Sequence, residues 1–176
     1  MPLTSQLAVQ LTATQTGSVA TPDLGSVAQV AHSLPLSKVV DLVSGTGAGA
    51  ADVLWSDTNT LTASATTDID LSGALTNAIG GTAVFARVKG LYVRAYDANT
   101  NNVVVGAAAT AQWLSLIGTA TGTVILRPGA AMLVMAGAAD ATGYTVTATT
   151  ADLLRIANSG AGTSVTYDIA IIGCSA

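Results

Sequence analysis

Very few side chains in this sequence could perform acid–base or nucleophilic catalysis. The chain has one histidine, His32, which a Ser-His-Asp or Cys-His mechanism would have to use as its base. His32 lies between Ala31 and Ser33 in a segment flanked by prolines, and no serine stands in the glycine pattern of a nucleophile elbow. We interpret His32 as a solvent-facing or interface residue, and we predict that the chain is not an enzyme and has no catalytic residues.

Residues that could bind a metal are equally sparse. Cys174 has no second cysteine with which to share a zinc ion, so a tetrahedral zinc site within one chain is excluded. Asp68 and Asp70 point to the same side of a predicted strand and, with Asp52 or Asp57, offer the oxygen ligands that calcium prefers. Alternating aspartates are also typical of an exposed strand face, and no twelve-residue calcium loop is present. We favour the exposed face and predict no bound metal.

A glycine-rich segment at residues 45–50 matches the G-x-G-x-x-A pattern of a dinucleotide-binding turn. Such a turn needs a helix after it, because the free amides of the helix N-terminus hold the phosphate. Residues 51–59 are instead rich in β-branched and turn-forming types, so we interpret the segment as a loop between strands and expect no cofactor. A two-carboxylate glycosidase is disfavoured as well, because the sequence has no glutamate and few aromatic residues to stack on sugars.

The composition excludes several further classes of protein. Six basic residues and a net charge of −4 do not provide the cationic surface that nucleic acid requires. Residues 98–126 carry no ionisable side chain, but asparagines and glycines interrupt them too often for a membrane-spanning helix. The first ten residues lack the basic start and apolar core of a secretory signal, and one cysteine cannot form an internal disulfide. We therefore expect synthesis in a cytoplasm and contact with neither nucleic acid nor a membrane.

The elements that would position any site are predicted to be strands, because apolar and polar residues alternate along most of the chain. Thr, Ser, Asn and Asp provide the polar residues, and these types favour strands and turns over helices. We expect a first strand in which Leu7, Val9, Leu11 and Ala13 share one face, then a long connection over residues 16–36. Further strands are predicted at residues 27–31, 38–43, 51–56, 59–65, 68–71, 83–96, 103–105, 113–117, 123–126, 131–135, 144–149, 153–157 and 164–172, with a helical turn at 74–79.

Many short strands with turns between them predict an antiparallel β-sandwich of jelly-roll type. We divide the chain into an N-terminal strand and extended arm at residues 1–37 and a sandwich domain at residues 38–176. The chain has four Tyr, two Trp and one Phe, which are few large side chains to fill the core of an isolated sandwich. It also has few charged residues to oppose association with other molecules. We therefore predict self-association as a homodimer or homotrimer.

One of two predicted contact surfaces follows a reversal of pattern inside residues 83–96. The apolar set before Gly90 is out of phase with the set after it, and one extra residue at a β-bulge would reconcile the two halves. After Gly90, the side chains of Tyr92, Arg94 and Tyr96 share one face, and tyrosine and arginine are enriched in interface cores. An ordinary exposed strand face, or the opposite wall of the core, is the alternative.

The second predicted contact surface is the N-terminal segment, with Leu7, Val9 and Leu11 as its apolar residues. It is uncharged up to Leu36 except for Asp23. We expect it to extend and pair with the sheet edge of a neighbouring subunit.

Eight motifs spread over residues 38–173 resemble a family of small structural proteins encoded by tailed bacteriophages. They are GTGAGAAD (45–52), LWSDT (54–58), LTASA (61–65), DIDLSG (68–73), ARVK (86–89), NTNNVVVG (99–106), RPG (127–129) and LLRIANSGAGTSVTYD (153–168). The resemblance implies a virion component, similar to the cement or decoration proteins that bind the major capsid protein on the capsid exterior. The alternative is a tail, fibre or host-receptor module that binds carbohydrate, for which an exposed Trp55 or Trp113 would be the distinguishing feature.

Overall fold

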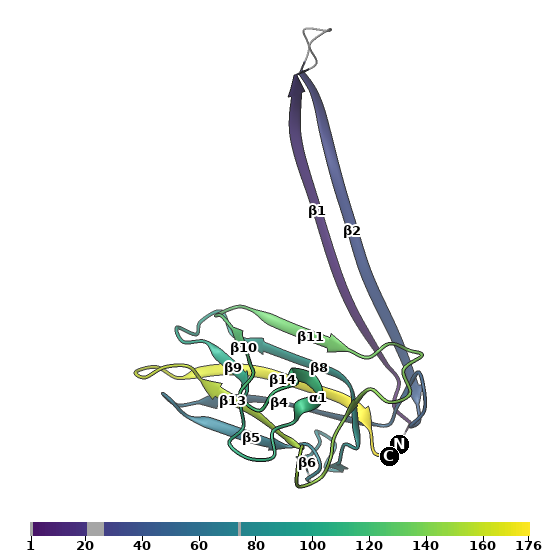
Figure 1. Cartoon of the computed structure of the whole chain (residues 1–176), viewed down its shortest axis with the longest axis vertical. Helices are drawn as coiled ribbons and strands as arrows, with labels where there is room; N and C mark the ends of the chain where they lie inside the picture. Colours follow the sequence, from purple (N-terminus) through teal and green to yellow (C-terminus); the bar gives the residue numbers. More distant parts are fainter. Residues whose placement is uncertain (1, 21–26, 74) are drawn as a thin grey trace.

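The computed structural model describes residues 2–20, 27–73 and 75–176 and confirms an all-β protein. Two sheets form a β-sandwich, and a two-stranded hairpin projects from it (Figure 1). The β8 sheet contains, in spatial order, β11 (Ala131–Met135), β8 (Arg87–Ala95), β14 (Val165–Cys174) and β4 (Val53–Leu61), and β12 (Tyr144–Thr145) also pairs with β8. The β9 sheet contains β10 (Thr123–Leu126), β9 (Val103–Gly106), β13 (Leu153–Asn158) and β5 (Thr66–Asp70).

In the β8 and β9 sheets, strands near the two ends of the sandwich sequence pair with each other, and strands near its middle pair with each other. Strand β4 pairs with β14, β5 with β13, β8 with β11 and β9 with β10, and every pair is antiparallel. In chain order, the first of these eight described strands therefore pairs with the last, the second with the seventh, the third with the sixth and the fourth with the fifth. This is the pairing of one long hairpin of eight strands that is wrapped into two layers.

The hydrophobic core lies between the two sheets. Alternate residues of β8 and β14, such as Leu91, Val93, Ile169 and Ile171, are buried there because successive strand residues point to opposite faces. The β9 sheet and the loops cover them with Val103, Val105, Leu154, Ile156, Phe85 and Trp113. Trp113 also donates a hydrogen bond from Nε1 to the Thr145 carbonyl at 2.7 Å, so its polar end is satisfied inside the domain.

The predicted irregularity near Gly90 is confirmed. The register between β14 and β8 shifts between Ile172, which faces Gly90, and Gly173, which faces Val88, so Lys89 is the extra residue of a β-bulge. Val88 and Leu91 consequently both face the core, although they are an odd number of residues apart. Of the apolar set predicted before the bulge, Val84, Ala86 and Val88, Val88 lies in the core but Val84 is exposed, and Ala83 and Phe85 are buried instead.

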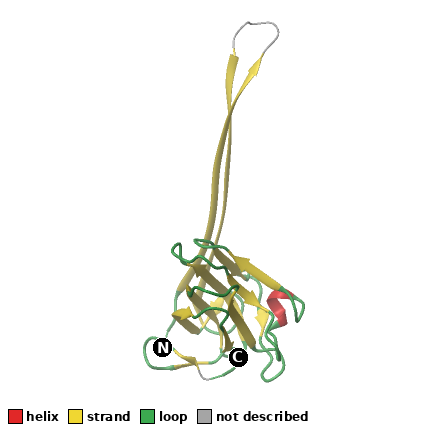
Figure 2. Ribbon diagram, turned by 90° about the vertical axis from the view of Figure 1, so that its left-hand side faces the viewer, coloured by secondary structure: helices red, strands yellow, loops and turns green. Residues whose placement is uncertain are grey.

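The projecting hairpin consists of β1 (Ser5–Ala20) and β2 (Val27–Ser44), which pair in unbroken antiparallel register from Ser5 and Leu42 to Ala20 and Val27. We call this hairpin the arm. Sixteen residues at about 3.4 Å each give it a length of about 50 Å. Figures 1 and 2 show it leaving the sandwich near the end of β11 and running across the strands of the domain rather than along them. At its base, Val43 and Ser44 pair in parallel with β3 (Ala50–Ala51).

Several predicted elements are wrong. The connection expected over residues 16–36 is strand on both sides of the undescribed residues 21–26, and residue 37 lies inside β2. Residues 53–61 form the single strand β4, so no separate strand covers residues 59–65. Two-residue strands, β6 (Leu75–Thr76) and β7 (Thr82–Ala83), replace the helical turn expected at residues 74–79, of which residue 74 lies outside the described residues.

A helical turn occurs instead at α1 (Leu114–Ile117), where a strand was expected. The turn ends because Gly118 adopts φ 78°, and its N–H bonds to the Leu114 carbonyl at 2.7 Å. Within the described ranges, no helix has the length and apolar content needed to cross a membrane.

Candidate interaction surfaces

The two faces of the arm differ in chemistry. Cross-strand partners share a face, so the register places Leu7, Val9, Leu11 and Ala13 of β1 on the same side as Leu34, Leu36, Lys38, Val40 and Leu42 of β2. We call this side the apolar face of the arm. The opposite side carries the polar residues Gln6, Gln10, Thr12, Thr14, Ser33, Ser37 and Asp41, together with Ala8, Pro35 and the exposed Val39. An amphipathic ribbon of this kind is suited to bind a surface with one face only.

The base of the apolar face packs on the chain's own domain. Leu7, Val40 and Leu42 are buried against Leu133, Met135 and Ile172 on the side of the β8 sheet turned away from the core, which we call the outer face. A Cβ placed on Gly90 would lie 2.7 Å from Leu7 Cδ1, so only glycine lets the arm approach this closely. Leu7 therefore makes an intramolecular contact, and its role in an interface between subunits stays a prediction.

Beyond the base, the same apolar face is exposed. Val9, Leu11 and Leu36 are 48%, 55% and 53% exposed, and Leu34 is exposed as well. A two-stranded hairpin without a covering layer is at most marginally stable in water. The distal arm therefore presents an apolar surface for which its own domain offers no cover.

Pairing of the N-terminal segment with another subunit's sheet edge stays a prediction, but the structure gives this strand a partner in its own chain. Strand β1 pairs with β2 of the same chain along its whole length. The partner residues Leu34 and Leu36 were not predicted, although their spacing of two residues is that of side chains on one face of a strand. Pro35 led to the prediction of a connection there, but proline is tolerated on an edge strand, and β2 is such an edge over this stretch.

Tyr92, Arg94 and Tyr96 lie together on the outer face, and Asp168 of the neighbouring strand β14 joins them. Asp168 Oδ1 accepts hydrogen bonds from Tyr96 Oη at 3.0 Å and from Thr58 Oγ1 at 2.7 Å. The Arg94 guanidinium carbon stands 5.3 Å from the centre of the Tyr96 ring, and Arg94 Nη1 is 4.0 Å from Asp168 Oδ2. The cluster is half-buried and held in place by its own hydrogen bonds, so it forms a prearranged polar surface.

A shallow hollow lies beside this cluster. Ser56, Thr58, Tyr92, Asp168 and Ala170 line it, together with backbone neighbours on β4 and β14. Tyr92 pairs with Ala170, which in turn pairs with Ser56, so two small side chains follow the tyrosine ring across the sheet. The hollow thus has an aromatic wall, a small-residue floor and a carboxylate at its rim.

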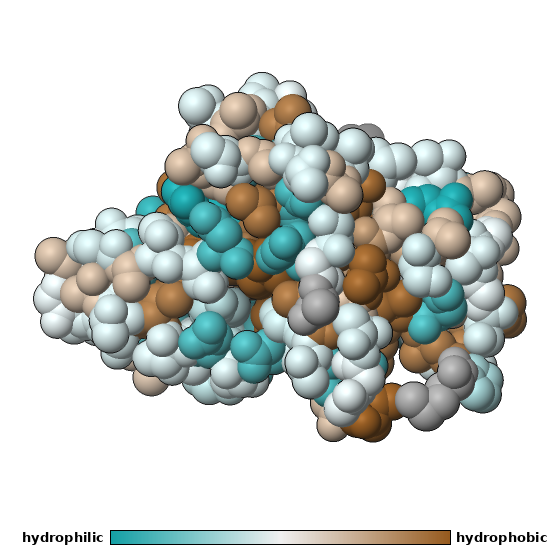
Figure 3. All heavy atoms as spheres, turned by 90° about the horizontal axis from the view of Figure 1, so that it is seen from below, coloured by the Kyte–Doolittle hydropathy of each residue, from teal (hydrophilic) through white to brown (hydrophobic). Residues whose placement is uncertain are grey.

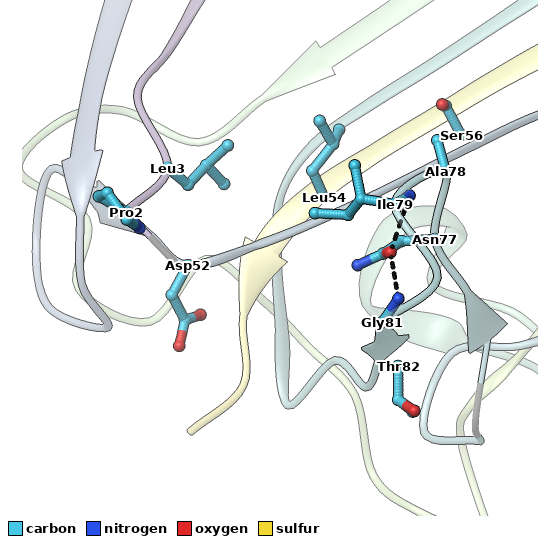
Figure 4. A pocket seen from close by; sticks show the side chains of 10 residues that line it. All are labelled: Pro2, Leu3, Asp52, Leu54, Ser56, Asn77, Ala78, Ile79, Gly81 and Thr82. Atoms are coloured by element: carbon cyan, nitrogen blue, oxygen red, sulfur yellow. Dashed lines mark hydrogen bonds between the residues drawn. The ribbon is translucent and has the colours of Figure 1, made fainter.

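A second hollow opens between the N-terminal residues, β4 and the β6–β7 hairpin (Figure 4). Leu3, Leu54 and Ile79 provide its apolar lining, and Asp52 is the ionisable side chain among its lining residues. Asp52 accepts hydrogen bonds from the backbone N–H and the hydroxyl of Ser175, so its carboxylate fixes the C-terminal segment. Seen from below, the surface of this end of the molecule is a mixture of hydrophobic and hydrophilic residues (Figure 3).

Two of the aspartates considered as calcium ligands, Asp68 and Asp70, accept hydrogen bonds within the chain. Asp68 accepts hydrogen bonds from Arg155 Nε at 2.7 Å and Nη2 at 2.8 Å, and this bond raises the pKa of Arg155. Asp70 Oδ1 accepts the N–H groups of Ser72 and Gly73 and closes a turn. Within the described part of the chain, no three His, Cys or Asp side chains are grouped as metal ligands.

Of the remaining candidates, His32 lies apart from Cys174 and the glycine-rich loop. His32 lies on the exposed arm opposite Gln15, far along β2 from the sandwich. Cys174 is buried, and desolvation raises the pKa of its thiol. Residues 45–49 form a turn between β2 and β3, as expected for a loop between strands, and no helix follows them. Cys174 Sγ lies 4.0 Å from the Gly45 carbonyl and 3.4 Å from the Ala50 carbonyl, so the structure brings Cys174 to this loop but leaves His32 on the arm.

Lys89 is buried, which its sequence position did not lead us to predict. Lys89 occupies the bulge on β8, is 1% exposed, and donates from Nζ to the Asp140 carbonyl. The carboxylate of Asp140 accepts the N–H groups of Gly143 and Thr142, which lower its pKa. The reversal of apolar phase around Gly90 was the available signal, because an extra residue in a strand must turn toward one of its faces.

Comparisons with models of protein families, with curated proteins and with solved structures gave no match to this chain.

Proposed function

We propose that this protein is a structural component of a bacteriophage virion, a cement or decoration protein that binds the major capsid protein on the capsid exterior. The observation that carries the proposal is the arm, whose apolar face continues about 20 Å beyond the buried Leu7, at about 3.4 Å per residue up to Ala13. A cement protein must bridge neighbouring molecules. A domain with a long amphipathic projection has the shape for that task.

The topology and the sequence motifs support the same proposal. The pairing of first with last strand, through to fourth with fifth, agrees with a jelly roll, in which eight strands form two packed sheets. The motifs that resemble phage structural proteins include residues 153–168, which cover β13 and the first part of β14 in the centre of the two sheets. The resemblance therefore involves the strands that define the sandwich as well as surface loops.

An exposed tryptophan would distinguish the alternative function, a carbohydrate-binding tail or receptor module. Trp55 and Trp113 are 8% and 1% exposed, so neither ring offers a platform for a sugar. We therefore retain the capsid role as the proposed function, with the protein itself and the major capsid protein as partners.

The test uses phage particles and a variant with a shortened arm. Replacement of residues 11–36 by Asn-Gly joins Gln10 to Ser37, which face each other in the hairpin, through a two-residue turn. The buried base with Leu7, Val40 and Leu42 stays intact. We expect the wild-type chain on the particle surface in many copies, with protection against heat, and we expect the shortened chain to give less protection.

Two results would overturn the proposal. One is the absence of the chain from purified particles. The other is its presence in a few copies confined to the tail.

A further inference from the structure

We infer that the arm of one molecule lies across the outer face of a second copy of this chain, in the hollow beside Tyr92. This inference rests on the proposed function, which requires the arm to bridge neighbouring molecules. It is tested without particles, so the two proposals fail separately.

The first argument is continuity. The base of the apolar face already packs on the outer face. There Leu7 lies over Gly90 and clusters with Ile172, the cross-strand partner of Gly90 on β14. The distal part of the same apolar face repeats this pattern with Val9, Leu11 and Leu36 but has passed the edge of its own sheet. A face with the same alternation is suited to the same kind of surface.

Part of the outer face lies beyond the base of the arm. Moving along β8 from Gly90, the next outward residues are Tyr92 and Arg94, and Tyr96 follows the strand. These side chains are half-buried, and none of them belongs to the hydrophobic cluster under the base of the arm. From residue 92 to residue 96 the strand extends about 13 Å, which accommodates two strands about 4.8 Å apart. The chain's own arm is fixed over Gly90, so a ribbon seated on this part of the face must come from another molecule.

The third argument is charge. Lys38 is the cation on the apolar face of the arm, next to Val9, while Asp41 lies on the opposite side. The outer face carries Asp168 at the rim of the hollow, and its Oδ2 has Arg94 no nearer than 4.0 Å. An arm seated in the hollow can bring the Lys38 ammonium to this carboxylate while Leu36 meets the Tyr92 ring. A second copy supplies both the apolar stripe and the cation.

The experiment measures the mass of the purified protein in solution and the effect of matched substitutions on it. Leu36→Asp places a charge on the apolar face of the arm, and Ser37→Asp places the same charge on the polar face one residue later. Both residues are exposed, so neither change disturbs the fold of the single chain. Ala170→Arg fills the floor of the hollow on the partner side.

We expect an oligomer of the 17.3 kDa chain that Leu36→Asp and Ala170→Arg each weaken at least about tenfold in dissociation constant, whereas Ser37→Asp leaves it unchanged. A monomeric wild type, or an oligomer that Leu36→Asp does not affect, overturns the inference. If Leu36→Asp dissociates the oligomer while a folded Ala170→Arg variant does not, the arm binds elsewhere and the assignment of the hollow is wrong.

Intermolecular cross-linking gives an independent measurement. A Leu36→Cys chain mixed with a Ser56→Cys chain should form a disulfide between the two, because Ser56 lines the hollow. A Ser37→Cys chain, whose thiol is on the polar face, serves as the control and should not form it. Equal yields from both mixtures overturn the proposed orientation of the arm.

Discussion

The contact between Leu7 and Gly90 allows a quantitative test of how the arm is anchored. A Cβ on Gly90 would lie 2.7 Å from Leu7 Cδ1 and 3.0 Å from Cδ2, and both atoms are at the free end of a flexible side chain. Gly90→Ala should therefore displace Leu7 without breaking the sheet. Overpacking costs about 1–3 kcal/mol, and replacing glycine by alanine within a strand returns about 0.5–1 kcal/mol. We expect a net loss of about 1 kcal/mol in the stability of the arm base.

Leu7→Ala tests the same contact from the other side. Leu7 is buried, and truncating a buried leucine costs about 2 kcal/mol or more. When both substitutions are present, the methyl group introduced at position 90 enters space that the leucine has left, so the clash disappears. The double variant should lose about 1.5 kcal/mol instead of the additive loss of about 3 kcal/mol, a coupling of about 1.5 kcal/mol.

Native-state amide exchange of residues 3–10 measures the free energy of opening of the arm base in the four proteins of this cycle. Ala8→Ser, at an exposed position on the opposite face of β1, is the control and should change the opening free energy little. Additive losses in the double variant would show that Leu7 and Gly90 do not constrain each other. The account of the glycine given above would then be wrong.

Three further predictions concern the sandwich. Gly173→Ala should prevent folding or destabilise the domain by several times the effect of Gly90→Ala, because its Cβ would collide with the Arg87 carbonyl oxygen of the neighbouring backbone as well as with the Phe85 ring. Urea unfolding measures this loss of stability, and a stable variant contradicts the prediction. Burial raises the pKa of Tyr167 from 10.0 to about 12, so the unfolded chain loses this proton first and the stability of the fold should decrease as the pH rises from 10 to 12. Tyr167→Phe should reduce this decrease in alkaline unfolding curves. Identical curves for the two proteins would show that Tyr167 does not cause the decrease. The Cys174 thiol is buried with a raised pKa, so iodoacetamide should label it slowly in the native protein and rapidly in denaturant, whereas equal rates would show that the C-terminal strand opens freely.

Local patterns were sufficient to predict much of the sandwich. Strands β10 and β11 were predicted with their observed bounds, because each is a short apolar run enclosed by glycine or proline turns. The bulge beside Gly90 was predictable from the change of apolar phase, since one extra residue is the simplest way to return both halves to the same core. The helical turn α1 was missed because four residues contain too little periodicity to distinguish a turn of helix from a strand.

The candidate interaction surface was only partly predictable. The alternation of Leu7, Val9 and Leu11 established that one face of the first strand is apolar, and the outward position of Tyr92, Arg94 and Tyr96 followed from their even spacing. The pairing of β1 with β2 did not follow, because a strand exposed on both sides is stabilised by its cross-strand partner and carries little signal of its own. Asp168 joined the cluster only through the register of β14 with β8.

By itself, the sequence determined an all-β protein of low charge whose first strand has one apolar face, since these properties depend on residue types and on the two-residue period of a strand. Only the tertiary structure decided which part of that face is covered. Leu7 and Leu11 occupy equivalent positions in the alternating pattern, yet Leu7 is buried over Gly90 and Leu11 is exposed beyond the sheet. The difference arises because the arm crosses the strands of the β8 sheet and extends past its edge, and the width of that sheet is set by strands that come from distant parts of the chain.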